Sequence, residues 1–191
     1  MNRVQVRRSK NKNSSKTIGL IIPTTTRDSS GNKMINSLDD LIFFKILLPS
    51  FLKCASNTHY YNFFLGYDHD DPFYSVEENR DLFLKRFEEV CPKIYTLTFV
   101  KFGSEIQKGD LSTMWSVLAD QAVKTNEYLY QLGDDIQFES KGWEDLFITL
   151  LKKQNNIGAV GPKDRGNSTG ILTQSFVHCT HLSIFKRYFP K

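Results

Sequence analysis

Two adjacent carboxylates that follow an apolar run are the clearest chemical signal in the sequence. Asp134 and Asp135 come directly after Gly133, at the end of the run 128–132, which is typical of a short buried strand. Carboxylates held side by side repel each other, and a divalent cation relieves that repulsion while it keeps positions for the oxygen atoms of a ligand. Oxygen ligands favour Mg²⁺ or Mn²⁺. The other interpretation is a solvated acidic turn, which is common for an isolated Asp-Asp pair.

Two further groups of polar residues also follow apolar runs. The first comes after the run 18–22 and comprises Pro23, Thr24, Thr25, Thr26, Arg27 and Asp28. Its hydroxyl groups, guanidinium and backbone N–H groups suit a phosphate or a nucleotide. The second comes after the run 60–65 and comprises Gly66, Tyr67, Asp68, His69, Asp70 and Asp71. These acids suit either a ligand or a turn, because Asp-x-Asp-Asp-Pro is also an ordinary turn sequence.

Histidines and tryptophans have less specific patterns. His178 and His181 lie three positions apart beside the last predicted strand, where a structural position and a ligand role both fit. Trp115 and Trp143 lie on apolar helical faces, so we expect both to pack in the core. The chain has no His-Glu-x-x-His or Gly-x-Ser-x-Gly motif, so a zinc protease and a serine hydrolase lose their usual support.

The apolar patterns around these residues alternate between strand and helix. We predict strands at 18–22, 60–65, 94–100, 128–132, 157–160 and 171–177. Helical spacing follows Ser37, Ser75, Asp110 and Gly142, and a last helical segment covers 178–185. Ser37 precedes Asp40 and Ser75 precedes Glu78 by three residues, which predicts a helix cap at each serine. This order predicts one α/β domain with a mainly parallel sheet, helices on both faces, and ligands beyond the carboxyl ends of the strands.

Length, composition and charge exclude several classes of protein. A chain of 191 residues that is 40% hydrophobic can bury one core, and its apolar runs are too short for a membrane span. Residues 1–16 carry six basic and no acidic side chains, so we expect a flexible basic tail in front of a domain at 17–191. Without those six, 19 of the 25 basic residues remain beside 21 acidic ones, so nucleic acid is not an expected partner of the domain. For the tail alone, contact with RNA, DNA or an anionic membrane is the alternative.

The cysteines indicate a reducing environment. Cys54, Cys91 and Cys179 are odd in number and far apart, which fits neither a disulfide framework nor a zinc site. We therefore expect a cytoplasmic location.

Several segments together point to a known family. They are TIGLIIPTTTRD at 17–28, YNFFLGYDHDDPFY at 61–74, YLYQLGDDIQF at 128–138 with GWEDLF at 142–147, and NIGAVGPKDRGNSTGILTQSFVHCTHLSIFKRYFP at 156–190. The chain resembles a nucleotide-sugar glycosyltransferase of the GT-A type, and is most similar to the small enzymes of this kind in large DNA viruses and protists. The resemblance covers nearly everything after the basic tail. It implies a single Rossmann-like GT-A domain and a metal-dependent hexosyltransferase.

The resemblance also implies roles for individual residues. The nucleotide would be bound by Pro23, Thr24, Thr25, Arg27 and Asp68. Gly133-Asp134-Asp135 would be the Asp-x-Asp motif of this sequence, with glycine in place of its first acid. That change moves the expected metal contact to Asp135 and puts Asp134 nearer the ribose or the sugar, with both acids at the catalytic centre. Gln174 and His178 would lie near the donor phosphates or the sugar, with His178 as a second metal ligand.

The C-terminal end departs from the family. Its members usually continue past the Phe-Pro near the chain end into a segment with another acidic motif, which supplies the base or orients the acceptor. We therefore expect a domain that is incomplete at its C-terminus, with Asp164 or Glu139 as the candidates for a base inside the chain. We also expect an exposed apolar cluster that mediates self-association, formed by Phe185, Tyr188 and Phe189.

The function that the resemblance implies is transfer of a sugar from a UDP or GDP sugar to an acceptor hydroxyl. Mn²⁺ or Mg²⁺ would lie at the Asp-Asp pair, and the acceptor would be a glycan or a protein. One alternative is a non-catalytic remnant that still binds a nucleotide. Another is the palm hairpin of a viral RNA polymerase, which also carries Gly-Asp-Asp, but 191 residues are too few for fingers, palm and thumb.

Overall fold

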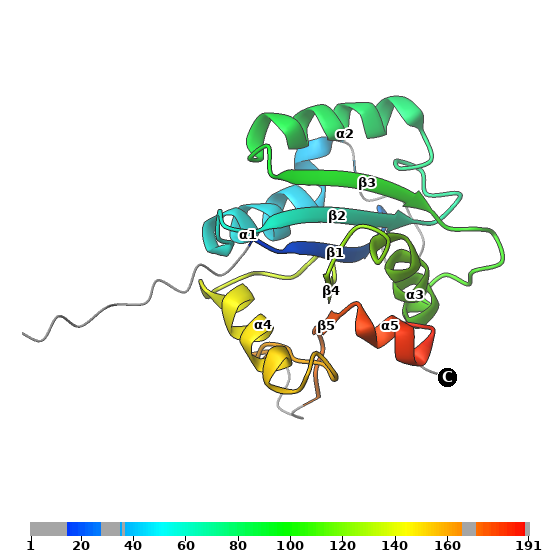
Figure 1. Cartoon of the computed structure of the whole chain (residues 1–191). Helices are drawn as coiled ribbons and strands as arrows, with labels where there is room; N and C mark the ends of the chain where they lie inside the picture. The colour runs from blue at the N-terminus through cyan, green and yellow to red at the C-terminus, as the bar shows by residue number, and fades with distance from the viewer. Residues whose placement is uncertain (1–14, 28–34, 36, 166–170, 190–191) are drawn as a thin grey trace, which may run out of the picture.

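The computed structural model of the chain describes residues 15–27, 35, 37–165 and 171–189. Most of the predicted basic tail therefore lies outside the described residues. Within them, strands and helices alternate around one sheet, as the apolar patterns predict (Figure 1). Among the described residues, the structure has no helix that is both long enough and apolar enough to cross a membrane.

The sheet of the described residues has the strand order β3-β2-β1-β4-β5. Its strands are β1 (Thr17–Thr24), β2 (Tyr60–Tyr67), β3 (Tyr95–Lys101), β4 (Tyr128–Gln131) and β5 (Ser175–His178). The first four run parallel to one another, and β5 pairs with β4 in the antiparallel direction. The predicted mainly parallel sheet is thus confirmed, and the carboxyl ends of β1 to β4 meet at one end of the sheet.

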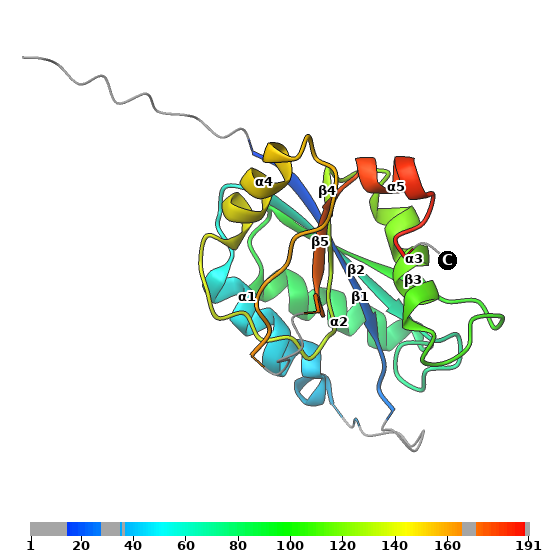
Figure 2. The same ribbon diagram turned by 90° about the horizontal axis from the view of Figure 1, so that it is seen from below.

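Helices cover both faces of the sheet. They are α1 (Leu48–Cys54), α2 (Glu77–Val90), α3 (Leu111–Ala122), α4 (Trp143–Lys153) and α5 (Thr180–Phe185). Figure 2 shows α1 and α4 on one side of the strands and α3 and α5 on the other. Successive side chains of β1 point to opposite faces of the sheet. Ile18 and Leu20 pack with α1, α2 and α4 on one face, whereas Ile21 packs with α3 on the other.

An aromatic cluster fills the layer beneath α1, α2 and α4. The ring of Phe51, in α1, is fully buried, and its centroid lies 5.1 Å from that of Tyr61 and 5.2 Å from that of Phe63. A carboxylate is buried in the same layer: Glu144 accepts hydrogen bonds from the Tyr61 hydroxyl at 2.6 Å and from the Ser56 backbone N–H at 2.7 Å. Burial and the bond to Glu144 raise the pKa of Tyr61. This network ties α4 to β2 and to the loop after α1.

Removal of the buried hydroxyl should weaken the fold measurably. We expect Tyr61→Phe to lower the free energy of unfolding by about 1–3 kcal/mol, because Glu144 stays buried with one donor fewer. Tyr60→Phe is the matched control: Tyr60 is the next residue but is 49% exposed, and its loss should change stability by less than about 0.5 kcal/mol. Urea unfolding of both variants measures this, and equal losses would contradict the role of the network.

Several predicted local features differ from the structure. The run 157–160 forms no strand, and its contact with the sheet is a single bridge between Val160 and Phe176. The last strand begins only at Ser175. Helix α2 has Val76 at its N-cap with no side-chain hydrogen bond, so the predicted Ser75 cap is wrong. The Asp110 cap of α3 is confirmed, since its carboxylate accepts from the Thr113 N–H at 3.2 Å.

The first helical segment is also more irregular than its pattern predicts. Ser37 stands before a 3-10 turn at Leu38–Asp40, and its hydroxyl donates to the Asp40 carboxylate at 3.1 Å instead of capping a backbone N–H. A π-helical turn at Phe43–Leu47 then leads into α1. Apolar spacing alone does not distinguish these helix types, because all of them place residues three to five positions apart on one face.

The C-terminal aromatic residues do not form the exposed cluster that we expected. Tyr188 is buried and its hydroxyl donates to the Ser175 carbonyl at 2.6 Å. Phe189 is half-buried, with its ring centroid 5.7 Å from that of Trp115, while Phe185 is 46% exposed. The expectation is therefore wrong for Tyr188 and Phe189, because they pack against β5 and α3. Self-association stays a prediction.

Candidate nucleotide-binding site

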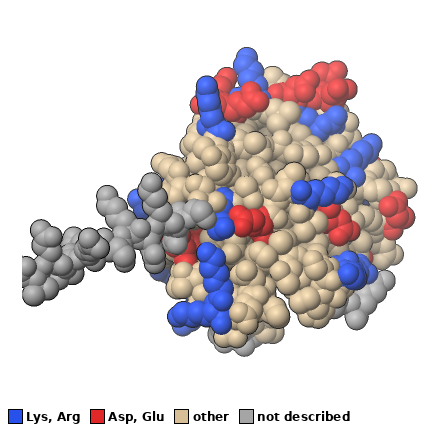
Figure 3. Space-filling view, in the orientation of Figure 1, with Lys and Arg blue, Asp and Glu red and all other residues tan. Residues whose placement is uncertain are grey.

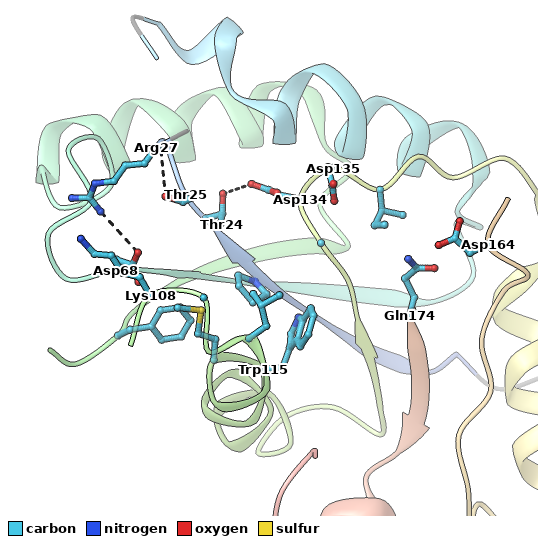
Figure 4. Close-up of a pocket in the computed structure, with 17 residues that line it drawn as sticks. Thr24, Thr25, Arg27, Asp68, Lys108, Trp115, Asp134, Asp135, Asp164 and Gln174 are labelled. Carbon is cyan, nitrogen blue, oxygen red and sulfur yellow. Dashed lines mark hydrogen bonds and ion pairs between the residues drawn. The ribbon is translucent and has the colours of Figure 1, made fainter. Parts of the chain in front are cut away.

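A cavity of about 750 Å³ lies at the carboxyl ends of β1, β2 and β4 and is closed on one side by α3 (Figure 4). Its lining residues are Pro23, Thr24, Thr25, Arg27, Asp68, Phe102, Lys108, Gly109, Leu111, Met114, Trp115, Gly133, Asp134, Asp135, Ile136, Asp164 and Gln174. Of the residues that the resemblance assigns to the nucleotide, the metal or the donor sugar, His178 alone is not among them. The parallel arrangement brings the others together because each lies at or just after the carboxyl end of its strand or, for Gln174, just before the antiparallel strand β5.

The loop after β1 is fixed by a buried carboxylate of the loop after β2. Asp71 is fully buried, and it accepts hydrogen bonds from the Thr26 N–H at 2.8 Å and the Thr26 hydroxyl at 2.7 Å. It also accepts from the Thr25 hydroxyl at 3.2 Å and from the N–H groups of Phe73 and Tyr74, both at 3.0 Å. The sequence left Asp71 open as a ligand or a turn residue. In the structure it holds the two loops that form one wall of the cavity.

The acidic pair lies where β4 meets the loop after β1. Asp134 accepts a hydrogen bond from the Thr24 hydroxyl at 2.7 Å, and the Tyr74 hydroxyl lies 3.3 Å from the same Thr24 oxygen. Burial raises the pKa of Asp134 to about 6; the Thr24 bond opposes this shift and the charge of Asp135 adds to it. Asp135 is exposed and belongs to the lining of the cavity. The two neighbours therefore differ: Asp134 is fixed and partly desolvated, and Asp135 is accessible to a ligand.

Charged residues surround the mouth of the cavity near the ends of β1 and β2. The Asp70 carboxylate accepts from Lys108 Nζ at 2.9 Å and from Arg27 Nη1 at 3.3 Å, and Arg27 Nη2 also donates to the Asp70 carbonyl. The Lys108 bond is the main reason that the pKa of Asp70 is lowered. Asp70 thus connects the loops after β1, β2 and β3.

Asp68 has few partners for a carboxylate in such a position. Its side chain is 13% exposed, its closest cation is Arg27 Nη1 at 3.9 Å, and it accepts no side-chain hydrogen bond from the described residues. Burial raises the pKa of Asp68, while the charges of Lys108 and Arg27 oppose that shift. In Figure 4 the carboxylate faces the cavity. It is therefore available to accept N–H or O–H groups of a ligand.

The opposite wall of the cavity is apolar and comes from α3 and the loop before it. The lining residues Phe102, Leu111, Met114 and Trp115 form it. The Trp115 indole N–H donates to the Leu132 carbonyl at 3.0 Å, which fixes the ring beside the strand that leads to Gly133. The expectation that both tryptophans pack in the core is confirmed: Trp143 is buried, and Trp115 is partly buried against the core cluster while it also lines the cavity. A flat ring would find apolar contact here and polar partners across the cavity.

Gln174 and Asp164 complete the site next to β5. The side chain of Gln174 is 8% exposed and lines the cavity. Asp164 accepts from the Thr173 hydroxyl at 2.7 Å. A Cβ atom at Gly161 would lie only 2.2 Å from the Gln174 carbonyl oxygen, so this loop can approach β5 because residue 161 is a glycine.

His178 lies at the other end of the sheet. It pairs with Tyr128 at the beginning of β4, whereas Ser175 pairs with Gln131 at the end of β4. Three residues of extended chain separate the two ends of β5 by about 10 Å. The expected metal role for His178 beside Asp135 is therefore wrong in this arrangement, since the antiparallel direction of β5 carries the histidine away from the cavity. Its ring nitrogen Nδ1 is instead 2.7 Å from the Thr180 hydroxyl, and burial lowers its pKa.

Sequence reasoning missed the residues that line the cavity from the loop after β3 and from α3, among them Lys108 and Trp115. Lys108 lies in the loop after β3, and Trp115 lies in the first turns of α3. The loop after β3 also follows the carboxyl end of a parallel strand, where ligands of such sheets bind. Its position in the chain could therefore have indicated the site. Its sequence carries no acidic pair or threonine run, so composition gave no signal there.

The acidic pair fits a hard divalent cation that completes its coordination from a ligand. Among the described residues, no group of three or more His, Cys, Asp or Glu side chains could hold a metal ion. Mg²⁺ typically binds through one or two carboxylates together with phosphate oxygens and water. Asp135, with its neighbour Asp134, provides such an incomplete set on the wall of a cavity that also contains Arg27 and Lys108.

Comparison with known proteins gives no further assignment. No known protein family matches the sequence. A search of curated proteins also finds no match.

Proposed function

We propose that this chain binds a nucleoside diphosphate sugar, a UDP or GDP sugar, and acts as a metal-dependent glycosyltransferase of the GT-A type. One observation carries the proposal: the polar residues expected to bind a nucleotide line the same cavity as the acidic pair expected to bind the metal. This cavity has an apolar wall for a planar base, two cations for phosphates and a hydrogen-bond acceptor at Asp68. The resemblance of the sequence points in the same direction.

In this proposal, different residues of the cavity contact different parts of the donor. The base or the ribose lies between the apolar wall of α3 and Asp68, which accepts its N–H or O–H groups. Arg27 and Lys108 attract the diphosphate. Asp135 holds the metal, and Thr24 fixes Asp134 beside it through the bond of 2.7 Å. When bound, a divalent cation at this pair supplies positive charge that stabilises the leaving diphosphate.

The proposed reaction exchanges one bond at the anomeric carbon. The bond from that carbon to the β-phosphate oxygen breaks, and its electron pair stays with the nucleoside diphosphate. A bond from the acceptor oxygen to the same carbon forms, and the acceptor hydroxyl gives up its proton to a base. The transition state has oxocarbenium character, so charge stabilisation at the leaving group is the main requirement on these residues.

A nucleoside diphosphate should stabilise the protein only when a divalent metal is present. At a hundredfold excess over the dissociation constant, binding to the native state should raise the free energy of unfolding by about 2.7 kcal/mol. Thermal unfolding with UDP or GDP and Mn²⁺ or Mg²⁺ measures this, and uridine and guanosine are the controls because they lack the phosphates. If neither nucleotide shifts the transition with either metal, the donor-binding proposal fails.

The alternative function is a nucleotide-binding protein without transferase activity. The two differ in what happens to the donor, because many transferases slowly hydrolyse it when no acceptor is present. Slow release of UDP or GDP from a panel of nucleotide sugars would favour the enzyme. Tight metal-dependent binding with no release of nucleotide would favour the non-catalytic alternative.

A further inference from the structure

A second cavity adjoins the proposed nucleotide site. It has a volume of about 340 Å³ and shares Asp135, Ile136, Asp164 and Gln174 with the first cavity. These four residues therefore form the boundary between the two spaces, so that ligands in the two cavities would lie next to each other. The second cavity has less than half the volume of the first, 340 Å³ against 750 Å³, which is enough space for one sugar ring.

The boundary contains a polar side chain that lacks an internal partner. Gln174 is 92% buried, and its amide forms no hydrogen bond with the described residues. Gln131 is also buried, but both polar atoms of its amide are hydrogen-bonded. The nitrogen donates to the Thr173 carbonyl at 3.2 Å, and the oxygen accepts from the Ser175 N–H at 3.0 Å. The amide atoms of Gln174 are not among the fully buried polar atoms without a partner in the described residues, so they are open to the cavities, where they can hydrogen-bond to a ligand.

The remaining walls of the second cavity combine aromatic rings with charged groups. Trp143 and Phe147 of α4 contribute apolar surface, and Glu139, paired with Arg165 at 3.0 Å, contributes polar atoms at the rim. A sugar ring has the same two-sided character, with C–H groups for the aromatic surface and hydroxyl groups for carboxylates and amides. An apolar chain would leave the amide of Gln174 without a partner.

We propose that the second cavity is the acceptor site and that it takes one pyranose ring, with Gln174 binding an acceptor hydroxyl. This inference rests on the proposed function, because it places the nucleotide in the first cavity. The phosphates then lie at Asp135, on the boundary, and the bond to be formed lies between the two cavities. The residues that bind this ring of the acceptor therefore lie mostly in the chain segment between β4 and β5.

The two tryptophans of the chain report on the two cavities separately. The sequence has two tryptophans, of which Trp115 lines the first cavity and Trp143 the second. In ¹⁵N-labelled protein each indole N–H gives its own NMR signal. The Trp143 indole N–H has no hydrogen-bond partner among the described residues, and the Trp115 N–H is bonded to Leu132. The two signals can therefore be assigned from single Trp→Phe variants.

The experiment is a two-step titration of the full chain with Mg²⁺ present. UDP or GDP is added first and should shift the Trp115 signal without shifting that of Trp143. The methyl glycosides of glucose, galactose, mannose and N-acetylglucosamine are then added one at a time, with mannitol as an open-chain control. At least one glycoside should shift the Trp143 signal, leave the Trp115 signal in place, and act more strongly than mannitol.

A pair of variants tests the location of the glycoside. Ser140→Phe places a ring at the rim of the second cavity and should abolish the glycoside-dependent shift while the nucleotide-dependent shift stays unchanged. Lys141→Phe is the matched control, because Lys141 is the next residue and does not line the cavity. It should keep both shifts.

The outcomes separate the two proposals. If the nucleotide shifts Trp115 but no glycoside shifts Trp143, or if Ser140→Phe keeps the glycoside-dependent shift, the acceptor site is refuted and the proposed function stands. A Trp143 shift caused by the nucleotide itself also refutes it, because the second cavity would then belong to the donor. If neither nucleotide shifts an indole signal, the proposed function fails and the acceptor site fails with it.

Discussion

Asp135→Asn should abolish metal-dependent nucleotide binding and leave the fold intact. The side chain is exposed on the cavity wall, so its replacement should change the free energy of unfolding by less than about 0.5 kcal/mol. Loss of a partner behind a metal ligand typically costs about 10- to 100-fold in metal affinity, and loss of the ligand itself should cost at least that much. Calorimetric titration of UDP and GDP with Mn²⁺, in wild type and variant, measures the effect.

Asp134→Asn provides the comparison within the same motif. Asparagine can still accept the hydrogen bond of the Thr24 hydroxyl, which Asp134 accepts at 2.7 Å, so this variant should bind more weakly than wild type but better than Asp135→Asn. Equal metal-dependent affinity in wild type and Asp135→Asn would refute the assignment of the metal to this pair. The reverse order of the two variants would move the metal contact to Asp134.

Asp71→Ala should destabilise the whole domain and disorganise the nucleotide site. The fully buried carboxylate accepts five hydrogen bonds from two loops. Each bond to a charged acceptor contributes about 1.5–3 kcal/mol, and the contributions are not additive, so we expect a loss of about 3 kcal/mol or more. Urea unfolding measures the loss, and amide exchange should accelerate at Thr26, Phe73 and Tyr74.

Asp70→Ala is the control for that experiment. Asp70 is the preceding residue and an acid of the same size, but it is exposed, and its closest partner Lys108 is exposed as well. Exposed ion pairs of this kind contribute about 0–1 kcal/mol. If Asp70→Ala and Asp71→Ala destabilise the protein equally, the structural role that we assign to Asp71 is wrong.

Local sequence determined the positions of the main strands and the residues that follow them. The runs 18–22 and 128–132 are apolar because central strands of a covered sheet are buried on both faces, whereas the run 94–100 alternates because β3 is an edge strand with exposed residues. Polar residues follow them because the carboxyl ends of such strands open to solvent and ligands. Thr24, Asp68 and Asp135 could therefore be assigned to one site before their distances were known.

Pairing direction and burial depend on residues that are distant in the chain. An apolar run has the same pattern in parallel and antiparallel strands, so the sequence did not predict that β5 runs backwards. That direction alone brings Gln174 to the cavity and carries His178 to the opposite end of the sheet. For the same reason the run 157–160 resembles a strand but makes a single bridge.

The acids after β2 show most directly what only the tertiary structure decides. Asp68, Asp70 and Asp71 occupy one short segment and have the same side chain. Asp68 faces the cavity, Asp70 pairs with Lys108 and Arg27, and Asp71 is fully buried. Their roles follow from the donors that other loops bring to them: Thr25 and Thr26 to Asp71, and Lys108 to Asp70. A carboxylate becomes structural where enough N–H and O–H groups offset its lost hydration, and those donors come from segments more than 30 residues away.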